Sequence, residues 1–69
     1  MLVKLLGKTI KERREELSIT QAHLAELAGI SINTLYKLER GQANPSLHLL
    51  NKLADVLGME LKLEVKKTS

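Results

Sequence analysis

The sequence predicts a mainly α-helical fold in which four helices form a bundle and one β-strand follows at the C-terminus. Three observations support this class. Leucine, isoleucine and alanine recur every three to four residues in four stretches, which is the period of a helix buried on one side. Glycines end three of these stretches, and after Gly58 the pattern alternates residue by residue, as in a strand. We therefore divide the chain into a helical domain over residues 1–58 and a strand with its tail over residues 59–69.

The helical domain is organised around two short helices joined by a tight turn, between Thr20 and Gly41. Thr20 is a good N-cap, because its hydroxyl can accept a hydrogen bond from a free N–H of the first turn. Gly29 ends this helix, since the residue after a helix commonly takes a positive φ. Ser31 caps the second helix, which ends at Arg40 and Gly41. Two short helices around a glycine-containing turn form a helix-turn-helix motif.

The first helix of the chain precedes this motif. Leu6, Ile10 and Leu17 recur at intervals of four and seven, which predicts a helix over residues 6–17. Residues 2–5 either extend this helix upstream or form an arm.

A fourth helix follows the motif, and Pro45 is placed to begin it. It ends at Gly58 and closes the core over the motif. The apolar positions expected at helical spacing in the motif and in this helix are Leu24, Leu27, Ala28, Leu35, Leu38, Leu47, Leu50, Leu53, Ala54 and Leu57.

The C-terminal segment is predicted to be a half-buried β-strand, because apolar and charged residues alternate strictly along it. A single strand leaves its backbone N–H and C=O groups unpaired, and no other clear strand exists in the sequence. The economical partner is the same strand of a second copy, paired antiparallel across a two-fold axis. The proposed dimerisation residues are Met59, Leu61, Leu63 and Val65 on the apolar face, and Glu60, Lys62, Glu64 and Lys66 on the charged face.

The charges select one register for this pairing. With Leu63 on the two-fold axis, every cross-strand pair is favourable, at about 0.2–1 kcal/mol each. Centring the pair on Lys62 or Glu64 would oppose like charges, and centring it on Leu61 or Val65 would shorten the ladder. The pairs in the chosen register are Lys62 with Glu64, Glu60 with Lys66, and Leu61 with Val65.

Length and composition limit the possible functions. A chain of 69 residues without cysteine is one domain near the lower limit for an independent core, with neither disulfides nor thiolate metal sites. A partner is therefore the expected source of additional stability. The net charge of +3 only weakly favours nucleic acid as that partner. No signal peptide or membrane span is evident, so we expect a cytoplasmic, nucleoid-associated protein with no membrane partner.

Several spaced residues resemble one family of regulators. Gln21 opens the first motif helix, Ala25 and Gly29 follow at intervals of four, and residues 38–41 read Leu-Glu-Arg-Gly. This combination is similar to the lambdoid-repressor (Cro/CI, XRE) class. The resemblance spans residues 6–58 and implies a lambda-repressor-like helix-turn-helix bundle.

The same resemblance implies a structural ion pair between Arg14 and Glu39. A guanidinium at a helix junction can bind a carboxylate through two parallel hydrogen bonds, and removing one partner would leave the other charge unpaired. The alternative is two solvated surface charges.

The resemblance also places the second motif helix in the major groove of DNA. Asn33 can bond adenine bidentately, Lys37 can donate to guanine, and Ile32 can only contact a thymine methyl group. Ile32 departs from many relatives, which carry a polar residue there. The base-contacting residues implied are Ser31, Ile32, Asn33, Thr34, Tyr36 and Lys37. Those expected to contact phosphate groups are Gln21 at the start of its helix, Arg40, Asn44, Lys8 and Lys11.

No residue pattern suggests catalysis or a cofactor. His23 and Glu26 lie three residues apart on one helix, a spacing that can bind a metal ion, but no further ligand is evident. The serines lack readable histidine and carboxylate neighbours. We therefore expect a protein that is not an enzyme and binds neither a cofactor nor a metal.

The function implied is a homodimeric, sequence-specific DNA-binding repressor that reads a palindromic operator. A short helix-turn-helix body with one C-terminal strand resembles HipB-like antitoxins. That likeness implies an antitoxin that autoregulates its operon, with a HipA-like kinase or an mRNA interferase as its toxin. The alternatives are a stand-alone phage or chromosomal repressor without a toxin partner, and a helix-turn-helix fold used only for protein–protein interaction.

Overall fold

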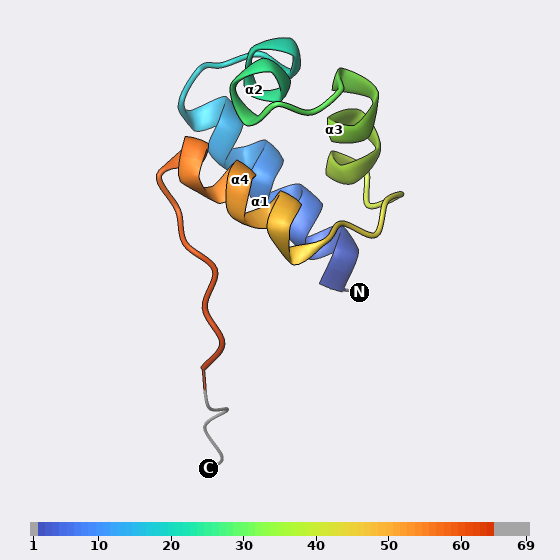
Figure 1. Ribbon diagram of the computed structural model, residues 1–69, viewed down its shortest axis with the longest axis vertical. Coiled ribbons are helices and arrows are strands. Elements are labelled where there is room, and N and C mark those ends of the chain that lie inside the picture. The colour runs from blue at the N-terminus through green and yellow to red at the C-terminus, as the bar shows by residue number, and fades with distance from the viewer. Residues whose placement is uncertain (1, 65–69) are drawn as a thin grey trace.

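The computed structural model describes residues 2–64 and contains four helices in this part of the chain. They are α1 (Leu2–Glu16), α2 (Gln21–Ala28), α3 (Ile32–Glu39) and α4 (Leu47–Leu57). Helices α1 and α2 each pack against both α3 and α4. Figure 1 shows α4 in front of α1, with α2 and α3 at the opposite end of the body from residues 60–64, which extend away from it.

Helix α1 begins at Leu2, so residues 2–5 extend the helix and do not form an arm. It passes through Gly7, which is buried because its backbone lies directly against the C-terminal end of α3. A Cβ atom at this position would overlap the carbonyl oxygen of Leu38. The helix ends at Glu16, one residue earlier than expected, and Leu17 is 40% exposed and does not belong to the core.

The bounds of the other helices follow from local caps. The hydroxyl oxygen of Thr20 accepts a hydrogen bond of 3.0 Å from the backbone N–H of His23. Ser31 caps α3 in the same way, and Gly29 ends α2 with a φ of 69°. The expectation that Pro45 begins the fourth helix is wrong, because the N-cap is Ser46. Its hydroxyl oxygen accepts from the N–H of Leu49 at 3.1 Å, which places the proline before the cap.

The core lies where the four helices meet. Its side chains that are less than 2% exposed are all leucines, namely Leu24, Leu35, Leu38, Leu53 and Leu57. Ile10, Ala25, Ala28, Leu50 and Ala54 complete the buried apolar set. Two leucines that were expected in the core are exposed instead. Leu27 is 53% exposed because α2 turns Leu24, Ala25 and Ala28 inward, and Leu47 is 74% exposed at the first turn of α4.

The expected C-terminal strand is not formed within residues 2–64. Met59 still belongs to the body, since its N–H donates to the carbonyl oxygen of Ala54 at 2.8 Å and its side chain packs against the core. None of the backbone hydrogen bonds between described residues involves residues 60–64. A strand requires a partner for these groups, and the described residues provide none. Val65 and Lys66, two of the predicted dimerisation residues, lie outside the described residues.

None of the helices within residues 2–64 is both long enough and apolar enough to cross a membrane.

Candidate nucleic-acid interface

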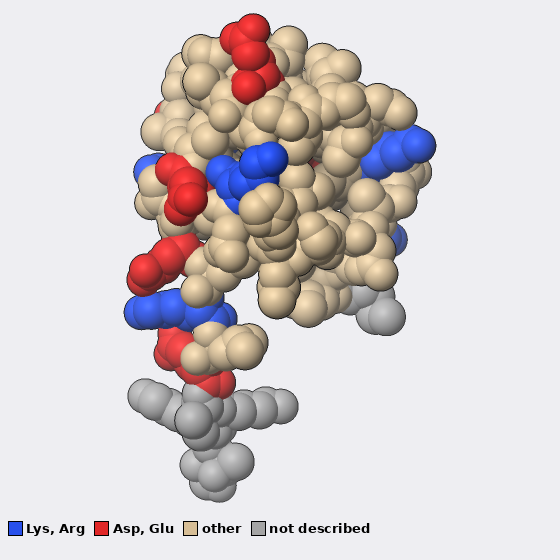
Figure 2. All heavy atoms as spheres, in the orientation of Figure 1, with Lys and Arg blue, Asp and Glu red and all other residues tan. Residues whose placement is uncertain are grey.

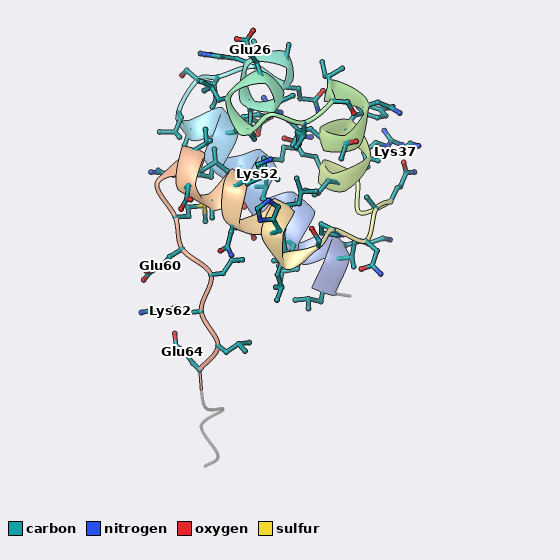
Figure 3. The ribbon with its side chains drawn as sticks, viewed as in Figure 1. Glu26, Lys37, Lys52, Glu60, Lys62 and Glu64 are labelled. Carbon is teal, nitrogen blue, oxygen red and sulfur yellow. The ribbon has the colours of Figure 1, made fainter. Side chains whose placement is uncertain are left out.

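Helix α3 has two different sides. Leu35, Leu38 and Glu39 are buried against the rest of the bundle. The opposite side carries Asn33 and Lys37, both exposed, together with Ile32 at 50% and Tyr36 at 45% exposure. Lys37 points away from the body at the edge of the molecule (Figure 3). The structure thus places these four predicted base-contacting residues on one accessible helix face.

The two remaining predicted base-contacting residues, Ser31 and Thr34, hydrogen-bond to each other. The hydroxyl oxygen of Ser31 accepts from the backbone N–H of Thr34 at 3.1 Å, and the two hydroxyl oxygens lie 2.8 Å apart. Thr34 is half-buried, whereas Ser31 is exposed. Their first role is therefore to cap α3 and fix where the helix begins.

Tyr36 and Arg40 form a second local pair on this face. The guanidinium carbon of Arg40 lies 5.2 Å from the centre of the Tyr36 ring, within the range of a cation–π interaction. Nη1 of Arg40 also donates to the phenol oxygen at 3.2 Å. The contact holds a positive charge beside the C-terminal end of α3, where Arg40 was predicted to contact phosphate.

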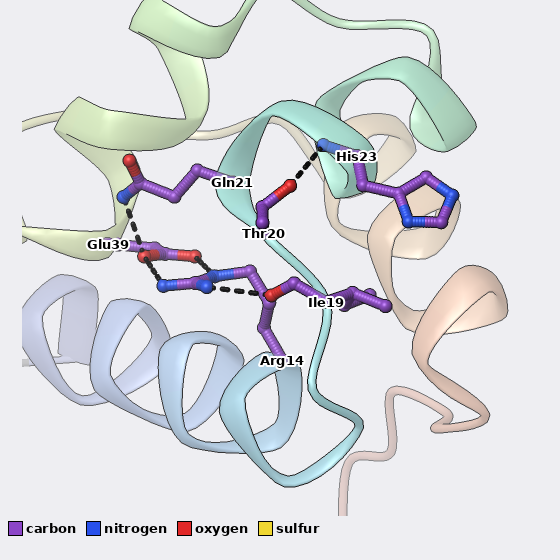
Figure 4. Close-up of polar contacts among 6 residues, drawn as sticks. All are labelled: Arg14, Ile19, Thr20, Gln21, His23 and Glu39. Carbon is purple, nitrogen blue, oxygen red and sulfur yellow. Dashed lines mark hydrogen bonds and ion pairs between the residues drawn. The ribbon is translucent and has the colours of Figure 1, made fainter.

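The predicted partners Arg14 and Glu39 form an ion pair beneath this face (Figure 4). Nε and Nη2 of Arg14 donate to the two carboxylate oxygens of Glu39, at 2.8 and 3.1 Å. Nη1 of Arg14 donates to the carbonyl oxygen of Ile19 at 2.9 Å. The side chains are only 11% and 2% exposed. The hydrogen bond to Glu39 raises the pKa of Arg14, an effect that outweighs the opposing effect of burial, so the guanidinium stays charged.

Gln21 joins this pair from the first residue of α2. Its amide Nε2 donates to the carboxylate of Glu39 at 2.9 Å, as Figure 4 shows. The sequence predicted a phosphate contact for Gln21 and did not anticipate the link to Glu39. One N–H of the amide is therefore used inside the protein, and the contact joins the start of α2 to the end of α3.

The other predicted phosphate-contacting residues lie outside α2 and α3. Lys8 and Lys11 are exposed on α1, and Asn44 is exposed in the loop between α3 and α4. The face over α4 is largely uncharged in Figure 2, where Lys52 is the basic residue near its centre and Lys37 lies at its edge. Basic groups are thus sparse on that face.

Two roles of basic residues on α1 were missed. Nε of Arg13 donates to the carbonyl oxygen of Leu57 at 2.9 Å, so this arginine satisfies the C-terminal end of α4. Lys4 lies against the loop after α3, where a Cβ atom at Gly41 would come within 2.6 Å of its Cγ atom. Both roles depend on how α1 crosses the other elements, so no local signal in the sequence could have found them.

Within residues 2–64, no group of three histidine or acidic side chains is placed to hold a metal ion. His23 and Glu26 are both exposed on α2.

Comparison with known proteins assigns this chain to a protein family. The sequence model described as "Helix-turn-helix" matches residues 10–63, which is most of the chain and includes α2, the turn and α3. The chain belongs to the helix-turn-helix family. This assignment confirms the family predicted from the sequence at the level of a helix-turn-helix regulator. The HipB-like subtype stays a prediction.

Relatives within the helix-turn-helix family are named as transcriptional regulators. An uncharacterised regulator of Methanothermobacter thermautotrophicus is 45% identical over 51 residues, covering 74% of this chain and 74% of that protein. A protein of Methanocaldococcus jannaschii named as an HTH-type transcriptional regulatory protein is 42% identical over 86% of this chain. The chain spans only 19% of that longer relative.

Two solved structures of similar proteins share the fold. The clp gene regulator ClgR of Corynebacterium glutamicum superposes with a TM-score of 0.83 at 32% identity, covering 86% of this chain and 63% of ClgR. The restriction-modification controller protein C.AhdI of Aeromonas hydrophila gives a TM-score of 0.79 at 39% identity, covering 86% of this chain and 88% of C.AhdI. These matches confirm the predicted helical bundle with a helix-turn-helix.

Proposed function

We propose that this chain is a DNA-binding transcriptional regulator that recognises its target by inserting α3 into the major groove. One observation carries the proposal: α3 is anchored by a buried side and presents Asn33 and Lys37 on an exposed side. The major groove admits an α-helix, and these two side-chain types form specific hydrogen bonds with bases. The names of the helix-turn-helix relatives support a regulatory role.

The contacts are divided between base reading and positioning. Asn33 reads adenine, Lys37 donates to guanine, and the half-exposed Ile32 packs against a thymine methyl group. Phosphate groups are bound by Arg40, which is held over Tyr36, and by the N-terminal end of α2. Gln21 contributes the amide N–H that Glu39 does not use. Asn44, Lys8 and Lys11 complete the proposed phosphate-contacting set.

The active form is a homodimeric repressor on a palindromic operator. The support is the alternating C-terminal segment, whose backbone groups at residues 60–64 have no partner among the described residues. Two copies related by a two-fold axis would place two recognition helices about 34 Å apart, or a multiple of that distance, on one side of the DNA.

The finer biological role is that of an antitoxin that represses its own operon and binds a toxin, a HipA-like kinase or an mRNA interferase. The resemblance of a short helix-turn-helix body with one predicted C-terminal strand to HipB-like antitoxins supports it. The second candidate is a regulator without a toxin, which the 39% identity to the controller C.AhdI favours. A toxin gene beside this gene, and a stable complex of the two purified products, would decide for the antitoxin. A restriction-modification gene pair in its place would decide for the controller.

Selection of bound sequences from a random pool of double-stranded DNA tests DNA recognition directly. We expect enrichment of a palindrome, and an affinity that falls steeply with salt because phosphate contacts release counterions. If only unrelated sequences are recovered and the affinity does not depend on salt, DNA recognition is contradicted. The alternative, a helix-turn-helix fold used only for protein–protein interaction, would then be supported.

A further inference from the structure

An open apolar hollow of about 640 Å³ lies between the helical body and the C-terminal segment. On the side of the body it is lined by the first two turns of α1 and of α4 and by Asn44 and Pro45 of the loop before α4, and the segment lines the other side. Leu2 and Leu47, at these two helix starts, are 69% and 74% exposed. The leucines that line it are Leu2, Leu6, Leu47, Leu50, Leu61 and Leu63.

The segment turns its apolar side towards this hollow without filling it. Leu61 contributes to the wall but stays 40% exposed, and Leu63 is fully exposed although it borders the hollow. The side chains of Glu60, Lys62 and Glu64 point away from the body in Figure 3, although Lys62 also contributes to the wall of the hollow. Exposed leucines thus surround a space that is much larger than one leucine side chain.

The charge pattern of the segment favours a second copy of this chain as the occupant of the hollow. Lys62 and Glu64 flank Leu63, so the segment is complementary to itself when two copies run antiparallel about that residue. A two-fold axis perpendicular to such a ribbon puts the apolar side chains of both strands on one face. The partner's apolar side chains therefore face the same body as Leu61 and Leu63 of this chain.

We propose that the C-terminal segment of the second copy lays its apolar face in this hollow, so that the first turns of α1 and α4 form part of the dimer interface. The inference rests on the proposed homodimer and adds what the paired strands pack against. The ribbon bridges two hollows, one on each body, and buries Leu2 and Leu47 of both copies. Backbone pairing joins the strands, and these leucines fix the ribbon to the helices that carry the recognition elements.

The test measures the dimer dissociation constant of full-length variants by sedimentation equilibrium. The double variant Leu2→Gln and Leu47→Gln changes the hollow at two exposed positions, and circular dichroism checks that its helical content and melting are unaltered. Leu27→Gln is the matched control, because Leu27 is a 53% exposed leucine on α2 that does not line the hollow. We expect the double variant to raise the dissociation constant about tenfold or more, and the control to leave it unchanged.

Proline substitutions distinguish this inference from the proposed homodimer. Neighbouring residues in a strand direct their N–H groups to opposite edges, so Lys62→Pro or Leu63→Pro removes a ladder hydrogen bond in either orientation. Suppose that a proline variant is monomeric but the Leu2→Gln and Leu47→Gln double variant dimerises like the unchanged chain. That result would support the strand pairing and overturn the role of the hollow. Equal weakening by Leu27→Gln would also overturn it. An unchanged chain that is monomeric at every concentration would overturn the homodimer itself.

Discussion

Arg14 on α1 and Glu39 at the end of α3 meet through two parallel hydrogen bonds of 2.8 and 3.1 Å in an almost fully buried site. The pair joins the first helix to the recognition helix, and Gln21 adds α2 to the same carboxylate. Three helices are therefore held at fixed positions around one charged group.

Replacing Glu39 with alanine leaves the Arg14 guanidinium buried without its counterion. We expect a loss of about 3–5 kcal/mol in the free energy of unfolding, measured by urea denaturation. Glu16→Ala is the control, because Glu16 pairs with Arg13 on the exposed surface at 3.4 Å and should cost less than about 1 kcal/mol. Equal losses in the two variants would contradict the structural role of the buried pair. Combining Arg14→Met with Glu39→Leu should recover much of the stability.

Gly7→Ala tests the close contact between α1 and α3. Alanine is the better helix former by about 1 kcal/mol, so an unobstructed site would gain stability. The new Cβ atom would instead overlap the carbonyl oxygen of Leu38, and backbone atoms cannot move aside cheaply. We expect a lower midpoint of thermal unfolding. Lys8→Ala, at the exposed neighbouring position, should stay within about 0.5 kcal/mol of the unchanged chain, and a stabilised Gly7→Ala variant would contradict this packing.

Asn33→Ala and Lys37→Ala test the proposed reading of bases. Each should weaken binding to the selected operator by about 1–3 kcal/mol and relax the preference for one base pair, measured by competition between operator variants. Lys52→Ala removes the same charge from α4, beside Gly29 in the turn and outside the proposed reading helix, so it should leave sequence preference unchanged. If the two α3 variants lose affinity equally for all DNA sequences, Asn33 and Lys37 contact phosphate groups only and do not read bases.

Charge reversal tests the register centred on Leu63. Lys62→Glu alone brings two glutamates together across the ribbon, and Glu64→Lys alone brings two lysines together, so each should weaken the dimer. The double variant restores opposite charges at every charged pair of this register, whereas each of the other registers considered then contains at least one pair of like charges. Recovery of the dissociation constant in the double variant is the expected result. Dimers that stay weak when both charges are reversed would exclude this register.

The sequence was sufficient for elements whose limits are set by neighbouring residues. The hydroxyl groups of Thr20 and Ser31, with Gly29 between them, act within one turn, so α2 and the start of α3 could be predicted closely. The start of α1 could not, because glycine disfavours a helix interior and the sequence does not reveal that Gly7 packs against the carbonyl oxygen of Leu38. The outward orientation of Leu27 likewise depends on which face of α2 the other helices cover.

In the candidate site, too, the features set by neighbouring residues could be predicted, and the contacts between residues far apart in the sequence could not. The exposed positions of α3 follow from helical periodicity once Leu35 and Leu38 are assigned to the core. The link from Gln21 to Glu39 and the bond from Arg13 to Leu57 join residues 18 and 44 positions apart, which periodicity cannot relate. The predicted strand is not formed within residues 2–64, where the backbone groups of residues 60–64 have no partner among the described residues.

The two-sided construction of α3 also bears on how such a protein acquires a new target. Its buried side holds the bundle together, whereas Ile32, Asn33 and Lys37 contribute almost nothing to the core. Substitutions at these three positions should therefore change the free energy of unfolding little, whereas many other mutations are eliminated because they destabilise the fold. If α3 reads DNA as proposed, binding preference can diverge rapidly between descendants of one gene while the scaffold that presents it stays constant.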